Sequence, residues 1–252
     1  MGKQTVSPLP LLRRLASFRR LLSPRNEGEG RFLVLSQSRS GSTLFTQLLN
    51  AHPDIHCAGE LLRDWVPLPK LYIESHRRHY KANVFGFKVF IHHLMRDQGI
   101  KDPERFLNRM HDQGYKLLYL KRENLLRHSM SQGLRKVTGV THTTSGVDLP
   151  SHRVDIETFM RHLRTREYFW REAEEALEGL PYHALSYEMD LENSACHQVA
   201  MDKVFLFLNL PPVTVQTNMK RINNKHLRDI LANYDELVQA VSGTPYARWL
   251  EG

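Results

Sequence analysis

Short apolar segments alternate along this chain with longer segments in which apolar residues recur every three or four positions. The short segments are residues 32–35, 54–58, 84–90, 116–121 and 182–186, and their length and composition predict β-strands. The longer ones, such as 155–178 and 192–210, predict helices. Strands that alternate with helices indicate an α/β fold, a parallel β-sheet flanked by helices on both faces.

A polar loop, residues 36–43, follows the first predicted strand and leads into a helix. The helix should end near His52, because Pro53 follows it. A Gly/Ser loop at a helix N-terminus directs backbone N–H groups, with the helix dipole behind them, toward one point. Arg39 adds a permanent positive charge to this loop. The segment therefore predicts an anion-binding site at the carboxyl edge of the sheet, where ligands bind in such folds.

The loop lacks the lysine that defines P-loop nucleoside triphosphatases. Their motif is G-x-x-x-x-G-K-[ST], in which the lysine reaches the terminal phosphates. Here Gly41 is followed by Ser42, and the residue five positions before Gly41 is Ser36. A P-loop kinase is therefore disfavoured, and the arginine two residues before the glycine points to transfer of a different group.

Composition and charge narrow the class of protein. A chain of 252 residues fits one domain, residues 31–252, preceded by a basic extension, residues 1–30. Lys and Arg exceed Asp and Glu by 35 − 27, a net charge of +8, which suits anionic partners. The cations are dispersed after residue 25, so we expect no nucleic-acid partner. Two cysteines, no long apolar run and no signal peptide together predict a cytoplasmic protein.

The N-terminal extension permits two interpretations. Between residues 8 and 22, a helical wheel places five apolar residues on one side: Leu11, Leu12, Leu15, Phe18 and Leu22. Such a helix either lies on a membrane surface or a partner, which would make the protein peripherally membrane-associated, or packs on its own domain. Residues 61–79 contain Pro67 and Pro69, which we expect to break any helix early. That segment and the irregular residues 138–151 are expected to line an acceptor pocket.

Four segments resemble sulfotransferases that use 3′-phosphoadenosine 5′-phosphosulfate (PAPS). Residues 38–43 resemble the loop that binds the 5′-phosphosulfate, and residues 121–131 resemble the strand and helix that bind the 3′-phosphate. Residues 186–188 resemble the segment that closes the fifth strand, and residues 218–250 resemble the C-terminus of the bacterial-type carbohydrate or lipid branch. The resemblance implies a P-loop nucleotide-hydrolase-like three-layer sandwich. It also implies in-line sulfuryl transfer to a hydroxyl or amine, 3′,5′-ADP (PAP) as product, and no metal.

The resemblance also implies a donor site. Arg39 would contact the bridging and 5′-phosphate oxygens, surrounded by Ser40, Gly41, Ser42 and Thr43. Arg122 and Ser131 would bind the 3′-phosphate. Ser129 is the second choice, because the spacing between the arginine and the serine does not decide between the two serines. Arg127 lies one helical turn before Ser131 and could reach the same phosphate. Tyr187 would stack near adenine, unless it is a core residue. A basic cluster would close over the 3′-phosphate, unless it is a solvated loop: Lys220, Arg221 and Lys225.

Sulfuryl transfer requires a base that removes the acceptor proton. Glu60, directly after the second strand, is the first choice, and His92 and His93 after the third strand are the alternatives. Lys88 within the third strand would steady the sulfuryl oxygens, or extend to the sheet edge as a structural lysine. The acceptor is a carbohydrate, lipid or small molecule that the sequence does not define. If Glu60 and both histidines lie away from the sulfur, an inactive nucleotide-binding protein is the competing interpretation.

Overall fold

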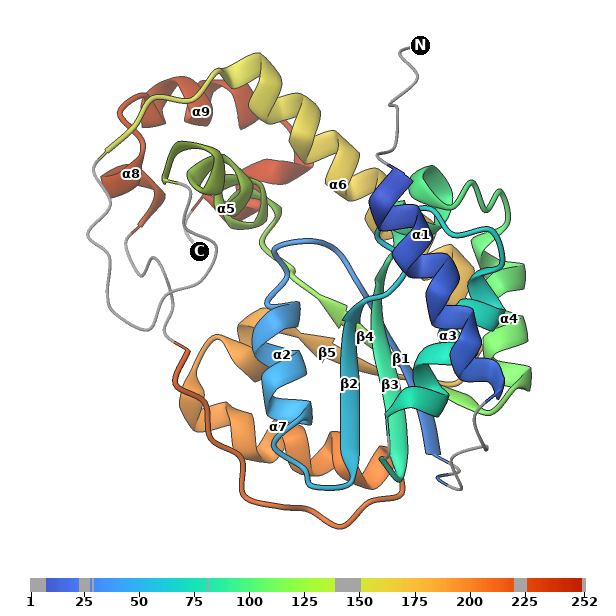
Figure 1. Cartoon of the computed structure of the whole chain (residues 1–252). Coiled ribbons are helices and arrows are strands. Elements are labelled where there is room, and N and C mark those ends of the chain that lie inside the picture. Colours follow the sequence, from blue (N-terminus) through green and yellow to red (C-terminus); the bar gives the residue numbers. More distant parts are fainter. Residues whose placement is uncertain are drawn as a thin grey trace.

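The computed structural model describes residues 8–22, 28, 30–80, 82–138, 151–219 and 226–250, the side chains of 8–11, 13 and 132–138 excepted (Figure 1). Five strands form one sheet: β1 (Gly30–Ser36), β2 (Ile55–Glu60), β3 (Val84–Phe90), β4 (Tyr115–Lys121) and β5 (Tyr182–Ser186). The strand order is β2-β3-β1-β4-β5, and every pair is parallel. The predicted α/β fold with a parallel sheet is therefore confirmed, and β1 lies at its centre.

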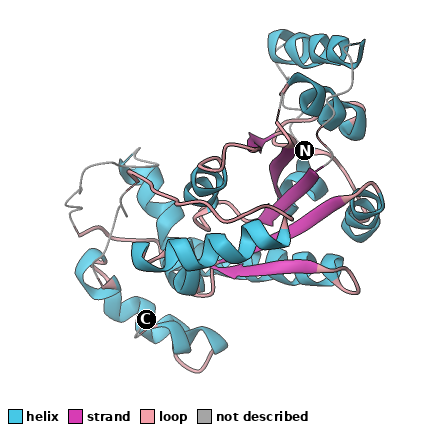
Figure 2. Cartoon of the chain, turned by 90° about the horizontal axis from the view of Figure 1, so that it is seen from below, coloured by secondary structure: helices cyan, strands magenta, loops and turns pink. Residues whose placement is uncertain are grey.

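Helices cover both faces of the sheet and form three layers (Figure 2). Phe32 and Val34 of β1 point to the face covered by α2 (Ser42–Leu49) and α7 (Ser194–Phe207). Leu33 and Leu35 point to the opposite face, because successive side chains of a strand alternate. That face is covered by α3 (Pro69–His79), α4 (Pro103–Asp112) and the C-terminal half of α6 (Ile156–Leu177).

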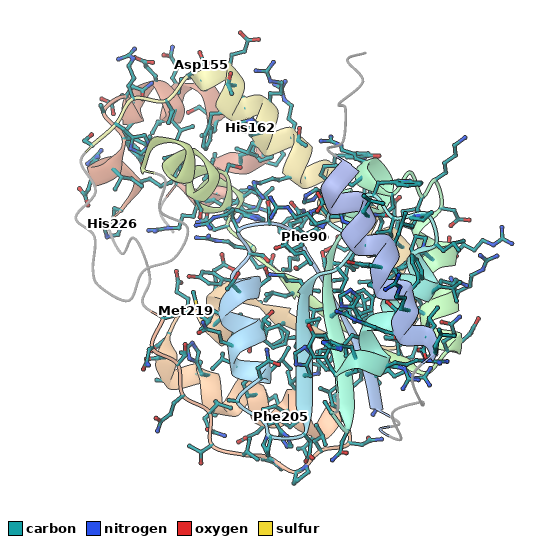
Figure 3. The ribbon with its side chains drawn as sticks, in the orientation of Figure 1. Phe90, Asp155, His162, Phe205, Met219 and His226 are labelled. Carbon is teal, nitrogen blue, oxygen red and sulfur yellow. The ribbon has the colours of Figure 1, made fainter. Side chains whose placement is uncertain are left out.

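A helical cap lies beyond the carboxyl ends of the strands (Figure 1). It has its own hydrophobic cluster, contributed by α5 (Leu125–Thr138), the N-terminal half of α6, α8 (Leu227–Ile230), α9 (Tyr234–Val241) and the 3₁₀ helix η4 (Pro245–Trp249). Phe90, at the end of β3, lies at the edge of the sheet nearest the cap, whereas Phe205 of α7 lies toward the other end (Figure 3). Helix α6 thus belongs to both the cap and the sheet layers.

The N-terminal segment packs on α3. It forms α1 (Pro8–Ser17) and a 3₁₀ helix, η1 (Phe18–Leu22). Phe18 packs on Tyr72 with 6.2 Å between ring centroids, and Arg14 forms a 2.5 Å ion pair with Asp64. The segment therefore packs on its own domain, one of the two interpretations that the sequence permits. Of the predicted apolar side, Phe18 contacts α3, and three leucines are exposed: Leu12, Leu15 and Leu22.

Several helical segments differ from the sequence-based expectations or were not predicted. Residues 61–79 do contain a helix, because Pro69 is the first residue of α3, where the N–H that proline lacks needs no partner. Residues 121–131 divide into the end of β4 and the first half of α5, which begins at Leu125, where the side chain of Asn124 accepts a hydrogen bond from the backbone N–H of Arg127. Short π-helices, η2 (His93–Asp97) and η3 (Tyr187–Leu191), follow β3 and β5 and were not predicted.

Most of the predicted loop at 138–151 lies outside the described residues. Across the described part of the chain, no helix is both long and apolar enough to cross a membrane.

Candidate functional site

The loop between β1 and α2 is tightly folded at the carboxyl edge of the central strand. Arg39 and Gly41 have φ angles of 70° and 86°, in the left-handed region. Both the backbone N–H and the hydroxyl of Ser40 donate to the carbonyl oxygen of Gln37, at 3.4 and 2.7 Å. Gly41 lies against the ring of Tyr187, so an added Cβ would come within 2.4 Å of it. These turns place the loop directly before Ser42, the buried first residue of α2, and the half-buried Thr43.

The two predicted halves of the donor site lie together. The guanidinium of Arg39 donates from Nε to Oγ of Ser131 at 3.1 Å, and Arg122 donates from Nη1 to the carbonyl oxygen of Arg39 at 3.1 Å. Arg122 is also buried. The loop between β1 and α2, the end of β4 and helix α5 therefore meet at one point.

The two candidate serines of α5 differ in their surroundings. Ser131 is half-buried and accepts the hydrogen bond from Arg39. Ser129 is buried, and its hydroxyl has no hydrogen-bond partner among the described residues. Arg127 is half-buried one helical turn before Ser131. This arrangement favours Ser131 as the serine beside the loop.

Arg166 and His128, which were not predicted from the sequence, contact the backbone of the loop. Arg166 donates from Nη1 to the carbonyl oxygen of Ser38 at 3.1 Å, and Nε2 of His128 lies 2.8 Å from the same oxygen. Gln37 donates to the backbone carbonyl of Arg166 at 2.9 Å. Each side of the loop is thus tied to α5 or α6.

These groups concentrate positive charge in a poorly hydrated place. Burial, and then the charges of Arg122 and Arg39, lower the pKa of Arg166 to about 9. Burial, and then the charges of Arg166 and Arg122, hold the pKa of His128 well below its usual range, so its ring is neutral at pH 7. Guanidinium groups that destabilise one another in this way would be stabilised by a bound polyanion.

One signal in the sequence could have identified Arg166. It falls in the apolar stripe of α6, between Leu163 and Phe169, both of which are buried. A charged residue on the buried face of a helix is rarely left without a specific polar environment. His128 had no comparable signal.

The segment after β5 braces the end of β4. The carboxylate of Glu188 accepts hydrogen bonds from the backbone N–H groups of Glu123 and Asn124, at 2.8 and 3.2 Å. Tyr187 is buried, with Cζ of Arg122 4.6 Å from its ring centroid. Tyr187 therefore packs between Gly41 and Arg122, and its predicted stacking on adenine stays a prediction.

The candidate acid–base residues form a second cluster beside the loop, at the ends of β2 and β3. Lys88 is buried within β3, and its Nζ lies 3.3 Å from Oε1 of Glu60. Nε2 of His93 lies 3.9 Å from Oε2 of Glu60 and 3.9 Å from Oδ2 of Asp97. The structure thus brings Glu60, Lys88 and His93 together.

The ring of His92 lies among aromatic side chains, and the charge of Glu60 is the weakest of the influences on its pKa. Its ring packs against Phe90 and Phe169, with centroids 5.5 and 5.6 Å apart. Burial, and then the charge of His93, lower the pKa of His92 to about 4. Burial, and then the charge of Arg63, lower the pKa of His93 to about 4. Neutral imidazoles with such low pKa values are weak bases at pH 7.

The predicted basic cluster of Lys220, Arg221 and Lys225 lies outside the described residues.

Residues 32–123 match the model of the sulfotransferase family. This stretch runs from β1 to just beyond β4 and includes Arg39, Glu60, Lys88 and Arg122. No curated protein sequence matches the chain. Among solved structures, the crystal structure of mouse sulfotransferase SULT7A1 complexed with PAP matches with a TM-score of 0.42 and 12% identity, over 94% of this chain and 92% of that one. The family match does not separate the bacterial-type branch from other sulfotransferases, so that branch stays a prediction.

Proposed function

We propose that this chain, whose residues 32–123 match the model of the sulfotransferase family, moves a sulfuryl group from PAPS to a hydroxyl or amine of an acceptor by in-line transfer. When bound, PAPS supplies an activated sulfuryl group and a phosphate leaving group on which negative charge develops. The observation that carries the choice of donor is the meeting of Arg39, Arg122 and Ser131.

The residues at this site fit such a donor. A 3′,5′-bisphosphorylated nucleotide needs two anion-binding regions, one for each end. The loop residues 39–43 and the start of α2 supply one, and Arg122 with Ser131 supplies the other. The positive charge of Arg39, Arg122 and Arg166 lies in a buried setting, where a bound phosphate is stabilised more strongly than in water.

Donor binding is tested by calorimetry with three ligands. PAP should bind without magnesium, and 5′-AMP, which lacks the 3′-phosphate, should bind at least about tenfold more weakly because a charge-assisted contact is lost. Binding of ATP with magnesium but no preference for PAP over 5′-AMP would instead support the kinase alternative.

The proposed base is Glu60. Its carboxylate is half-exposed, so an acceptor can reach it, whereas His93 is buried and has a lowered pKa. Lys88 holds one carboxylate oxygen at 3.3 Å and leaves the other to accept a proton. With a donor bound, the same ammonium group would also be placed to steady sulfuryl oxygens.

The variant Glu60→Gln tests this role. It should bind PAP as the wild type does and lose turnover by about a hundredfold or more. Glu175→Gln, an exposed glutamate of α6, is the matched control and should be fully active. Unchanged turnover in Glu60→Gln, with loss in a His93→Gln variant, would move the base to His93.

The acceptor class is a carbohydrate, a lipid or another small molecule. Incubating the protein with labelled PAPS and a cell extract would identify it, because the label marks whatever product forms. Transfer of label that Glu60→Gln abolishes would support an active enzyme. Tight PAP binding with no labelled product in any extract would favour an inactive nucleotide-binding protein.

A further inference from the structure

An exposed apolar surface lies on the N-terminal helix and on the segment that leads into α3. We call it the α1 surface, and its members are Leu12, Leu15, Leu22, Trp65, Leu68 and Leu71. Leu22 is 89% exposed and Trp65 is 50% exposed. These exposed side chains lie on two segments that contact one another, as the hydrogen bond from Arg14 to the backbone of Trp65 shows, and exposed apolar residues on neighbouring segments commonly belong to an interaction site.

The helix that carries this surface is fixed to the domain by its other side. Ser17 is buried, and Phe18 packs on Tyr72 of α3. Arg14 pairs with Asp64 and also donates to the backbone carbonyl of Trp65 at 3.2 Å. Arg78 of α3 donates to the carbonyl oxygen of Leu21. The exposed leucines are therefore presented on a docked helix, with Trp65 next to it.

The charge around the α1 surface is positive. Residues 1–26 contain six basic residues and no aspartate or glutamate. Arg19 is exposed on the helix itself, Arg63 is exposed two residues before Trp65, and Lys70 lies beside Leu71. The carboxylate of Asp64, the residue before Trp65, is paired with Arg14, and that of Glu74 in α3 is paired with Arg77 and Arg78.

We propose that the α1 surface docks the protein on an anionic membrane surface. Leucines and a tryptophan would enter the interface between headgroups and acyl chains, and the surrounding arginines and lysine would attract anionic headgroups. A neutral protein partner would match the leucines but would leave the exposed cations unpaired. An anionic bilayer matches both features.

Docking in this way would place the membrane close to the proposed acceptor side of the site. The segment from Glu60 to Trp65 links the proposed base to the α1 surface, and Arg63 is near enough to His93 to lower its pKa. The α1 surface thus favours a membrane-borne acceptor, such as a lipid or a glycolipid. This last step rests on the proposed function, whereas membrane docking does not.

Vesicle flotation of the full chain tests the docking. Vesicles of phosphatidylcholine with phosphatidylglycerol should retain the protein, and vesicles of phosphatidylcholine alone should retain far less. Arg19→Gln should weaken binding about fivefold, the effect of one surface cation. Leu15→Glu should abolish it, and Leu206→Glu, which alters an exposed leucine of α7, should not.

Tryptophan fluorescence gives a second readout that does not depend on a charge substitution. Brominated lipids should quench Trp65, and the quenching should disappear in Trp65→Phe, which leaves Trp170 and Trp249 in the cap. Circular dichroism checks that each variant is folded. Absence of wild-type binding to anionic vesicles, equal loss in Leu206→Glu, or a dimer that Leu15→Glu dissociates would each overturn the proposal. If Glu60→Gln kept its turnover, the proposed base would be wrong, but membrane docking by the α1 surface would not be affected.

Discussion

Arg166 and Ser38 lie 128 residues apart in the chain and are joined by a 3.1 Å hydrogen bond from the guanidinium Nη1 to the backbone carbonyl oxygen. Arg166 comes from the middle of α6, where this helix passes from the cap to the sheet layers. The bond ties the phosphate loop to a residue that also brings buried positive charge beneath it. We regard Arg166 as a positioning residue for the donor loop.

We predict that Arg166→Gln lowers the affinity for PAP and for 5′-AMP alike, by about tenfold, because the loop that receives the 5′-phosphate loses its support. Arg166→Lys should recover part of the affinity, since it restores the charge but not the planar fork. Calorimetry with both nucleotides measures this. Arg171→Gln, an exposed arginine of the same helix, is the control. A loss confined to PAP would show that Arg166 acts on the 3′-phosphate instead.

Ser131→Ala should weaken PAP binding about five- to tenfold and 5′-AMP binding less, because it removes the contact near the 3′-phosphate and also the acceptor of the Arg39 hydrogen bond. Ser129→Ala is the matched comparison. Its buried hydroxyl has no described partner, so its removal should change PAP affinity little and should not destabilise the fold. Calorimetric titrations of the two variants decide which serine contacts the 3′-phosphate. A larger loss of PAP affinity in Ser129→Ala would assign this contact to Ser129.

Gly41→Ala should abolish PAP binding and destabilise the protein. The φ angle of 86° strains any residue with a Cβ, by about 1 kcal/mol or more, and this Cβ would also meet the Tyr187 ring at 2.4 Å. Gly179→Ala has a similar φ of 74° but open space around its Cβ, so it isolates the strain. Urea unfolding should show a larger loss for Gly41→Ala. Equal losses would mean that Tyr187 moves aside freely.

Stability should fall as the pH is lowered from about 6.5 toward about 4. Burial, and then the charge of Arg20, lower the pKa of His76 to about 4, whereas an unfolded histidine titrates near 6.5. The unfolded chain therefore binds the proton first, and the folded state loses up to about 1.4 kcal/mol per pH unit for each such histidine. His92 and His93 should add to the effect.

The variant His76→Phe isolates one of these histidines. Neither ring nitrogen of His76 has a hydrogen-bond partner among the described residues, and the ring packs on Tyr72 with centroids 4.6 Å apart. A phenylalanine keeps the ring contact and cannot take up a proton. Urea unfolding at pH 7 and pH 5 should show a smaller difference for the variant than for the wild type. An identical difference would exclude His76 as a contributor.

Local patterns in the sequence were enough to predict the sheet and the polar loop that follows its first strand. The strand at Val84–Phe90 was predicted with its observed bounds, because a short apolar run needs no distant information. Proline misled the prediction at Pro69, since the same residue breaks a helix in its interior and begins one at its first turn.

Contacts made across long sequence separations could not be predicted in the same way. The choice between Ser129 and Ser131 depends on the rotation of α5 about its axis, which its packing against α6 sets. Arg166 reaches Ser38 only because α6 crosses the carboxyl edge of the sheet. Which of the N-terminal apolar residues are covered likewise depends on a distant contact, that of Phe18 with Tyr72 of α3.

Helix α6 packs in both the cap and the sheet layers, so removal of the C-terminal helices should also affect the loop after β1. Its N-terminal half is covered by residues near the C-terminus, including Leu237 and Val241, and Tyr246 donates a hydrogen bond to Glu167, the neighbour of Arg166. Removing residues 226–250 would uncover Phe159 and Leu163 and admit water toward Arg166. The last residues of the chain therefore help to keep the dielectric constant low around a loop that begins near residue 37.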